Sequence, residues 1–262
     1  MLSLQQVSKT FFPNTVNERK ALREVDLRLD EGDFVTIIGS NGAGKSTLLN
    51  VIAGSLPADG GVISIDDKDV TKLPDFRRAS LIARVFQDPQ AGTSPHLTIE
   101  QNMAIALTRG KGRGLGRGVS PERRAAFKEE LKVLGLGLED RLRTRVGMLS
   151  GGQRQALSLL MAAFTRPKIL LLDEHTAALD PQRAELVTNL TVKVVGESKL
   201  TVLMVTHNMA QALRVGNRLV MMHEGRIIYE LDAEAKKQTS VADLMNEFKR
   251  VKGQMADRSL LS

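Results

Sequence analysis

A glycine-rich run near the N-terminus has the spacing of a phosphate-binding loop. It extends from Gly39 to Thr47 with the pattern Gly-x-x-x-x-Gly-Lys-Ser, directly after the apolar run Phe34–Ile38. Its glycines let backbone N–H groups point at an anion, and the helix that follows adds its positive N-terminal end. We expect Lys45 to reach the β- and γ-phosphates of a nucleotide and the Ser46 hydroxyl to hold Mg²⁺. The predicted nucleotide-binding residues of this loop are Gly39, Ser40, Asn41, Gly42, Ala43, Gly44, Lys45, Ser46 and Thr47.

Two further runs contain residues that could act on a bound phosphate. The first, Ser150–Gln153, reads Ser-Gly-Gly-Gln and begins a predicted helix. Taken alone, it is equally well an ordinary helix start, with Ser as the N-cap and Gly after it. The second is the apolar run Leu170–Leu172, which is followed by Asp173 and Glu174. A strand that ends in two carboxylates is expected to place them beside the phosphates.

Together and in this order, the three runs resemble the motifs of the nucleotide-binding subunit of an ATP-binding cassette (ABC) transporter. The resemblance covers nearly the whole chain, with Gly39–Ser46 as Walker A, Lys168–Glu174 as Walker B and Leu149–Gln153 as the signature. In this family the signature contacts the γ-phosphate that is bound to the opposite subunit. The resemblance therefore implies a homodimer or a pair of cassettes, arranged head to tail with ATP at both seams. The signature residues would be Ser150, Gly151, Gly152 and Gln153.

The resemblance also implies which residues hydrolyse ATP. Asp173 would assist Mg²⁺ through its water shell, and Glu174 would be the general base that orients or deprotonates the attacking water. Gln87 matches the Q-loop glutamine, which senses Mg²⁺ or the γ-phosphate, and His207 matches the switch histidine. Asp180 matches the D-loop aspartate, in the loop that crosses to the opposite subunit. The predicted catalytic set is Lys45, Gln87, Glu174 and His207, and the predicted Mg²⁺ ligands are Ser46, Gln87 and Asp173.

The remaining predictions concern aromatic and histidine residues. Phe11 resembles the aromatic residue that stacks on adenine, although either Phe11 or the adjacent Phe12 could belong to the core. His175 stands where the family usually has Pro. It either tunes the pKa of Glu174 or simply replaces a turn residue, and the sequence favours the second interpretation. His96 and His223 are expected on the surface.

Short β-rich runs alternate with helical patterns, which predicts an α/β fold: a P-loop NTPase core of mostly parallel sheet. Leu2–Val7 and Leu22–Leu29 alternate apolar and polar residues, as an N-terminal antiparallel β subdomain would. Helical patterns over Thr98–Thr108, Pro121–Leu134 and Gly151–Phe164 predict an inserted helical subdomain. The strands of the core are expected at Phe34–Ile38, Leu81–Phe86, Ile169–Leu172, Leu200–Val205 and Arg218–Met222.

We predict a single ABC ATPase domain over residues 1–262. Residues 1–89 and 167–235 would form its nucleotide-binding core and residues 90–166 its helical subdomain. Residues 236–262 would form a C-terminal helix and tail, in which an apolar stripe of Val241, Leu244, Met245 and Phe248 predicts a packed helix. The basic, glycine-rich stretch 109–118 is interpreted as a solvated linker, and a contact with lipid headgroups or an acidic partner is the alternative.

Composition narrows the class of protein. An excess of Lys and Arg, 37 against 30 Asp and Glu, gives a net charge of +7, which favours polyanion partners in general. The chain has no Trp and one Tyr, so it offers few platforms for unpaired bases, and nucleic acid is not expected as a partner. The absence of Cys excludes disulfides, zinc–thiolate sites and cysteine nucleophiles. No apolar run is long enough to cross a bilayer, so we expect a cytoplasmic protein, peripheral on the inner face of the membrane.

These features favour the ATP-hydrolysing, energy-coupling subunit of a membrane transporter. The resemblance implies separate integral membrane permease subunits, an importer, and an extracytoplasmic substrate-binding protein as partners. The alternative is a soluble ABC ATPase that acts on nucleic acid, ribosomes or cofactor assembly, and the basic composition favours it slightly. A binding module that has lost catalysis is excluded because every expected hydrolytic residue is present. The cassette does not touch the cargo, so its sequence does not identify the transported substrate.

Overall fold

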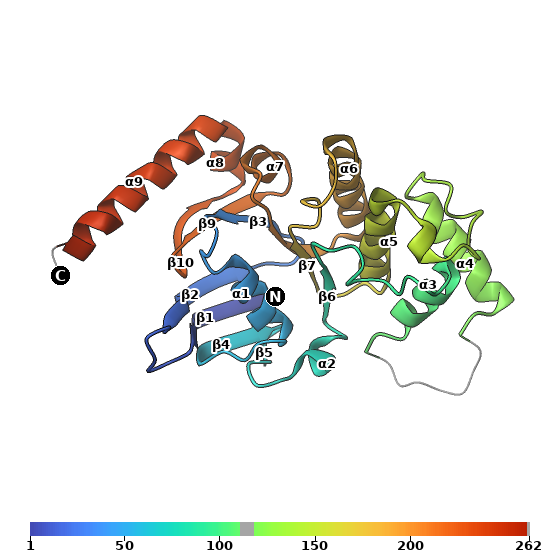
Figure 1. The fold of residues 1–262 in the computed structure, drawn as a ribbon, viewed down its shortest axis with the longest axis horizontal. Coiled ribbons are helices and arrows are strands. Elements are labelled where there is room, and N and C mark those ends of the chain that lie inside the picture. The colour runs from blue at the N-terminus through green and yellow to red at the C-terminus, as the bar shows by residue number, and fades with distance from the viewer. Residues whose placement is uncertain (111–117, 261–262) are drawn as a thin grey trace.

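The structure is a computed structural model that describes residues 1–110 and 118–260, with side chains described as far as Val251 (Figure 1). The basic stretch 109–118 therefore lies mostly outside the described residues, and neither of its two interpretations is tested. No helix in the described part of the chain is long and apolar enough to cross a membrane.

A six-stranded sheet forms the centre of the fold. Its order is β10-β9-β3-β8-β7-β6, and every neighbouring pair is parallel except β9 with β10. The interior strands are buried along almost their whole length because helices cover both faces of the sheet. The mostly parallel core predicted from the sequence is thereby confirmed. The strands are β3 (Phe34–Gly39), β6 (Ile82–Val85), β7 (Ile169–Asp173), β8 (Thr201–Val205), β9 (Arg218–His223) and β10 (Arg226–Leu231).

A second, antiparallel sheet lies at the N-terminal side, as predicted. Its order is β2-β1-β4-β5, from β1 (Leu2–Phe11), β2 (Arg19–Leu29), β4 (Gly60–Ile65) and β5 (Lys68–Asp69). Helix α1 (Lys45–Ala53) packs its apolar side chains into the core that this sheet shares with the central sheet (Figure 1). The β1–β2 hairpin is longer than the alternating pattern predicts. Register shifts along it interrupt the alternation without ending the pairing.

Helices follow the edge strand β6 in the middle of the chain. They are α3 (Ile99–Leu107), α4 (Pro121–Lys132) and α5 (Gly151–Phe164), and a 3₁₀ turn at Val146–Met148 precedes α5. Side-chain caps begin each helix: Thr98 and Ser150 form capping boxes, and Ser120 accepts a hydrogen bond from the Arg123 N–H. A short helix, α2 (Asp75–Arg78), lies before β6. Helices α3, α4 and α5 match the helical patterns of the sequence, whereas α2 was not predicted.

The remaining helices belong to the C-terminal part of the chain. They are α6 (Pro181–Ser198), α7 (Met209–Arg214), α8 (Ala233–Gln238) and α9 (Val241–Leu260), and α9 extends away from the rest of the molecule (Figure 1). Helix α9 packs against the core through Leu244 and Phe248, as predicted, whereas Val241 and Met245 of the same stripe are exposed. The expectation that His223 lies on the surface is wrong. Its side chain is 7% exposed because Phe248 of α9 packs edge-on against the ring.

Candidate active site

The phosphate-binding loop joins β3 to α1, and two of its glycines lie where there is no room for a side chain. Gly39 has a φ of 154°, and a Cβ there would lie 2.2 Å from the carbonyl oxygen of Met222. Gly44 has a φ of 102°, and a Cβ there would lie 2.4 Å from the carbonyl oxygen of Ala21. Any side chain at these two positions would force the loop away from the strands beside it. The loop therefore presents backbone N–H groups and the N-terminus of α1, which together favour an anion.

Lys45 is the cation of this loop. Its residue is only 6% exposed, and Nζ donates hydrogen bonds to the carbonyl oxygens of Gly39 at 2.9 Å and Ser40 at 3.0 Å. Burial lowers the pKa of Lys45, and the negative charges of Glu174 and Asp173 act in the opposite direction. The ammonium group thus lies against the loop with carboxylates near it. This arrangement places a positive charge where the phosphates of a nucleotide would lie.

The two carboxylates lie at the carboxyl end of β7. Glu174 has a φ of 44°, in the left-handed region, and its N–H donates to the carbonyl oxygen of Val205 on β8 at 3.0 Å. Asp173 accepts a hydrogen bond from Arg84 Nη2 at 2.5 Å, and Arg84 Nη1 donates to Asn50 Oδ1 at 2.6 Å. Sequence reasoning missed Arg84. The available signal is that it is the one charged residue of the short strand β6.

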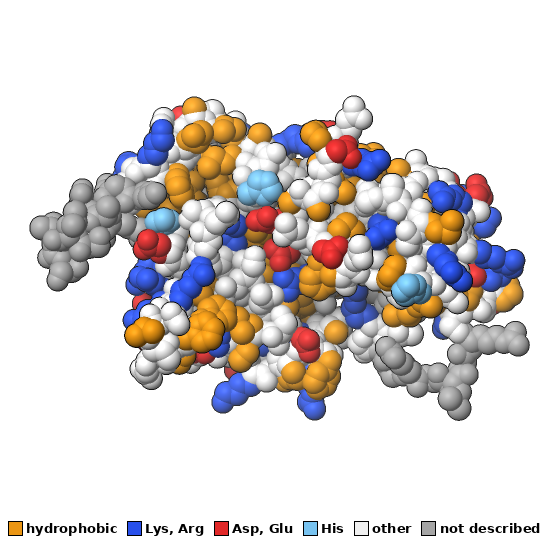
Figure 2. Space-filling model, viewed as in Figure 1, with side chains coloured by type: hydrophobic (Ala, Val, Ile, Leu, Met, Phe, Trp, Pro, Cys, Tyr) orange, Lys and Arg blue, Asp and Glu red, His pale blue; other side chains and the backbone are white. Residues whose placement is uncertain are grey.

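His207 lies beside the candidate general base. It follows β8 and Thr206, and its Nδ1 is 3.3 Å from Glu174 Oε2. Parallel strands end at the same edge of a sheet, so adjacent strands β7 and β8 bring the two side chains together. Figure 2 shows acidic side chains and a histidine close together near the middle of one face. A carboxylate with a neighbouring imidazole can hold a water molecule and accept its proton.

His175 points away from this pair. Its side chain is buried, and Nε2 lies 2.9 Å from Thr191 Oγ1 on α6. Thr191 donates its own hydroxyl hydrogen to the carbonyl oxygen of Val187 at 2.8 Å, so His175 must donate from Nε2. Burial lowers the pKa of His175 to about 4, which makes the ring neutral near pH 7. The ring is thus a core contact after Glu174, in line with the interpretation that the sequence favours.

The signature segment lies at the start of α5. Ser150 Oγ accepts from the Gln153 N–H at 3.3 Å, and Gln153 Oε1 accepts from the Ser150 N–H at 3.2 Å. Gly151 and Gly152 form the first turn, and Ser150 is exposed. Within the described residues, neither Ser150 nor Gln153 makes a hydrogen bond to the phosphate-binding loop of its own chain. One chain therefore leaves the signature free to meet another surface.

The other predicted site residues lie at the ends of elements. Gln87 is exposed directly after β6, and Gln155 of α5 donates to the carbonyl oxygen of Phe86 before it at 3.1 Å. Asp180 is the N-cap of α6, where it accepts from the Arg183 N–H at 3.1 Å. Phe11 ends β1 and is half-buried, whereas Phe12 beside it is exposed. Phe12 is therefore not the core residue of the pair.

The oxygen donors at this edge of the sheet fit Mg²⁺. Ser46 and Gln87 are exposed, and Asp173 ends β7, which lies between β3 and β6 in the order of strands in the sheet. Magnesium prefers oxygen ligands and usually completes its shell with water and substrate phosphates. No cluster of three or more His, Cys, Asp or Glu side chains that could hold a metal occurs among the described residues. A metal here would accordingly be held jointly by these residues and a nucleotide.

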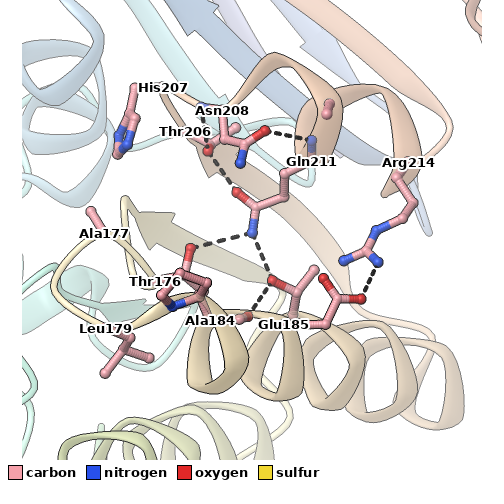
Figure 3. A pocket seen from close by; sticks show the side chains of 13 residues that line it. Thr176, Ala177, Leu179, Ala184, Glu185, Thr206, His207, Asn208, Gln211 and Arg214 are labelled. Carbon is pink, nitrogen blue, oxygen red and sulfur yellow. Dashed lines mark hydrogen bonds and ion pairs between the residues drawn. The ribbon is translucent and has the colours of Figure 1, made fainter.

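A polar network lies behind the strand ends and was not predicted from the sequence. Gln211 of α7 is hydrogen-bonded to Thr206, Thr176 and Thr188, three residues that come from different segments (Figure 3). Beside it is a cavity of about 490 Å³, lined in part by Leu179, Glu185, His207 and Arg214. The network connects the segment after Glu174 with the segment before His207.

Comparison with known proteins identifies this arrangement. The family model described as ABC transporter matches residues 22–177. A tyrosine transport ATP-binding protein of Clostridioides difficile is 41% identical over 249 residues, which cover 95% of this chain and 98% of that protein. An aliphatic sulfonates import ATP-binding protein of Albidiferax ferrireducens is 35% identical, with 92% of this chain and 78% of that protein covered.

Solved structures agree with the sequence comparisons. The dimeric, post-hydrolysis structure of the ATP-binding cassette MJ0796, bound to ADP and Pi, matches with a TM-score of 0.74 and 33% identity. The match covers 89% of this chain and 99% of that one. The similarity thus includes the central sheet, the antiparallel sheet and the helices between them.

Proposed function

The chain belongs to the ABC transporter family and is an ATPase, and we propose that it is the energy-coupling subunit of a membrane importer. Two copies would act head to tail on separate permease subunits. The observation that carries this proposal is the near full-length similarity to a transport ATP-binding protein, 41% over 95% of this chain. The proximity of Lys45, Asp173, Glu174 and His207 at one edge of the central sheet supports the same conclusion.

In the proposed reaction, the Walker A loop and Lys45 bind the phosphates of ATP. Glu174 orients the attacking water and accepts its proton, while His207 holds the carboxylate in place and reaches toward the γ-phosphate. Bound Mg²⁺, held by Ser46, Gln87 and Asp173 with the phosphates, would neutralise negative charge. The bond between the γ-phosphorus and the bridging oxygen then breaks, and ADP and phosphate are the products. Phe11 would stack on the adenine.

Dimerisation completes the site in this proposal. In the part of the chain that the structure describes, Ser150 makes no hydrogen bond to the phosphate-binding loop, so it would be available to the γ-phosphate held by a partner. Asp180 would lie at the same seam. The related cassette MJ0796 was solved as a dimer bound to ADP and Pi. ATP would therefore close the dimer, and hydrolysis would allow it to reopen.

A groove beside Gln87 supports docking of a permease. The groove has a volume of about 280 Å³ and lies between α2 and β6. Its wall includes Phe76, which is 69% exposed, together with Arg84 and Phe86. An exposed aromatic ring at a groove is typical of a protein interface. Because Gln87 directly follows Phe86, a permease segment in this groove would lie next to a residue of the ATP site.

The names of the relatives indicate which cargo and location to test. The C. difficile relative is named for tyrosine transport, so an amino acid such as tyrosine is the cargo to test first. An importer of this kind would receive its cargo from an extracytoplasmic substrate-binding protein. The cassette itself would lie on the cytoplasmic face of the membrane, held there by the permease.

A pull-down from native membranes tests the proposal. Tagged Glu174→Gln protein is incubated with ATP in detergent-solubilised membranes, and a Ser150→Arg, Glu174→Gln double variant is the control. We expect a protein with several membrane spans to co-purify in stoichiometric amount, together with or encoded beside a substrate-binding protein. Recovery of ribosomal or assembly-factor proteins without a membrane partner would overturn the importer and favour the soluble ABC ATPase.

A further inference from the structure

Gln211 connects three segments of the chain through its side-chain amide. The residue is 8% exposed on α7. Its Oε1 accepts from Thr206 Oγ1 at 2.7 Å, and its Nε2 donates to Thr188 Oγ1 at 2.8 Å and to Thr176 Oγ1 at 3.3 Å. These four residues, Thr176, Thr188, Thr206 and Gln211, form the Gln211 network (Figure 3). The Gln211 amide uses both of its donors and one of its two acceptor positions in these bonds.

The hydrogen bonds around the network allow one orientation of the amide. Thr188 donates its hydroxyl hydrogen to the carbonyl oxygen of Ala184 at 2.7 Å, so toward Gln211 it can only accept. Thr206 Oγ1 accepts from the Asn208 N–H at 3.1 Å and gives its hydrogen to Gln211. A flipped amide would place two acceptors face to face at Thr188. The network is therefore directional, and each member depends on the others.

Two members of the network adjoin the candidate catalytic residues. Thr206 directly precedes His207, and Thr176 is two residues after Glu174. The His207 and Glu174 side chains lie 3.3 Å apart. The cavity of about 490 Å³ beside the network includes Thr176, Thr206 and His207 in its wall. Backbone pairing of β7 with β8, extended by the Glu174 N–H to Val205 hydrogen bond, places the two segments side by side. Beyond the strand ends, at the wall of this cavity, the hydrogen bonds of Gln211 join the Thr176 and Thr206 side chains.

We propose that Gln211 is a positioning residue for ATP hydrolysis, which holds His207 and Glu174 in register through Thr206 and Thr176. This inference rests on the proposed roles of Glu174 and His207. Gln211 would not touch ATP or the attacking water. A displacement of about 1 Å at a catalytic group costs roughly 100-fold in rate, so loss of the network should lower turnover while nucleotide still binds.

Gln211→Leu is the variant that removes the network with little change in volume. We expect kcat for ATP to fall about 10- to 100-fold, with KM and directly titrated ATP affinity within about twofold of wild type. The same substitution in a His207→Ala background should have less than about a twofold further effect on kcat, since the proposed role of Gln211 is to set the position of His207 relative to Glu174. Independent, multiplying effects of the two substitutions would overturn the proposal.

Gln211→Glu supplies a pH-dependent rescue. A protonated Glu can donate to Thr188 and accept from Thr206, whereas the carboxylate can only accept. The ratio of variant to wild-type kcat should therefore rise as the pH falls. The titratable or charged groups that face the same cavity are His207, Glu185 and Arg214, and all three are present in both proteins compared. A ratio that does not change with pH, or that falls, would contradict the proposed hydrogen bonds.

Asn102→Leu is the matched control, because Asn102 is another buried amide with several hydrogen bonds, at Ser94, Leu97 and Thr98. It should lower stability without a selective loss of kcat. A different result would show that the proposed function is wrong. In that case Glu174→Gln and His207→Ala would hydrolyse ATP at the wild-type rate. If those two variants are inactive while Gln211→Leu keeps wild-type kcat, the function stands and the positioning role is wrong.

Discussion

Arg84 Nη2 lies 2.5 Å from Asp173 Oδ2, and both side chains are largely buried. The pair joins neighbouring strands β6 and β7 at the edge where a nucleotide would bind. Arg84 also donates to Asn50 of α1, and its guanidinium lies 4.7 Å from the centre of the Phe86 ring. Asp173, the predicted Mg²⁺ ligand, is therefore already paired with a cation that connects it to the helix of the phosphate-binding loop.

Arg84→Met should leave the Asp173 carboxylate buried without its counter-charge. Breaking one partner of a buried pair costs about 3 kcal/mol, and we expect the free energy of unfolding in urea to fall by that order. Mg²⁺-ATP should raise the melting temperature of the variant more than that of wild type, because the bound cation replaces the lost charge. Arg28→Met removes an exposed pair with Asp30 and should cost less than about 1 kcal/mol. Equal Mg²⁺-ATP shifts in wild type and Arg84→Met would refute this explanation.

Lys45→Ala should weaken nucleotide binding. Charge-assisted hydrogen bonds contribute about 1.5–3 kcal/mol, so ATP affinity measured by calorimetric titration should fall roughly 10- to 100-fold. Lys168→Ala removes an exposed lysine that pairs with Asp66 and should leave affinity unchanged. If Lys45→Ala bound ATP as tightly as wild type, Lys45 would have no role at the phosphates.

His175 should make stability depend on pH. Burial lowers its pKa from 6.5 to about 4 in the folded chain, so between these values the unfolded chain binds a proton that the folded chain does not. The contribution of neutral His175 to the free energy of unfolding is fully present above pH 6.5. As the pH falls toward 4, this contribution is lost, and the free energy of unfolding decreases by about 3 kcal/mol in total.

Comparison of His175→Gln with wild type isolates this effect, since Gln can still donate to Thr191 but does not titrate. From pH 7.5 to 5, wild type should lose about 2 kcal/mol more unfolding free energy than the variant. His96→Gln, at an exposed histidine, should show the same change of unfolding free energy with pH as wild type. Parallel curves for wild type and His175→Gln would show that His175 does not titrate as its burial implies.

Ser150→Arg should block closure of the dimer and preserve binding of ATP to the monomer. The bulky cation would occupy the space where a partner's γ-phosphate and loop must approach. Loss of the N-cap itself costs only about 1 kcal/mol. Ser120→Arg removes the equivalent cap of α4 and should dimerise normally. Light scattering measures the ATP-dependent dimerisation of both variants in a Glu174→Gln background. An ATP-dependent dimer of Ser150→Arg would contradict the assignment of Ser150 to the signature.

Local patterns in the sequence predicted the parts of the fold that depend on local physics. The continuously apolar runs around Phe34–Ile38 and Ile169–Leu172 are buried strands, because a parallel sheet is covered on both faces. The glycines before Lys45 predicted a phosphate-binding loop, since only glycine allows the backbone to approach so closely. Ser150 is the N-cap of α5, as its position before the helical pattern suggested, and its capping box with Gln153 was not predicted.

Contacts between distant segments could not be predicted in this way. The Arg84–Asp173 pair depends on β6 lying next to β7, and the hydrogen bonds of Gln211 depend on α6, α7 and β8 meeting. His223 is buried because α9 brings Phe248 back to β9. Each of these contacts follows from the tertiary arrangement, which a pattern in one segment does not contain.

The most direct test of the account is the mass of Glu174→Gln in solution with ATP, measured by light scattering alongside its ATPase rate. The substitution keeps the shape of the side chain and removes the proposed base. We predict a dimer with ATP, a monomer with ADP, and a turnover at least about 100-fold below wild type. A monomer in saturating ATP, or turnover at the wild-type rate, would contradict the account.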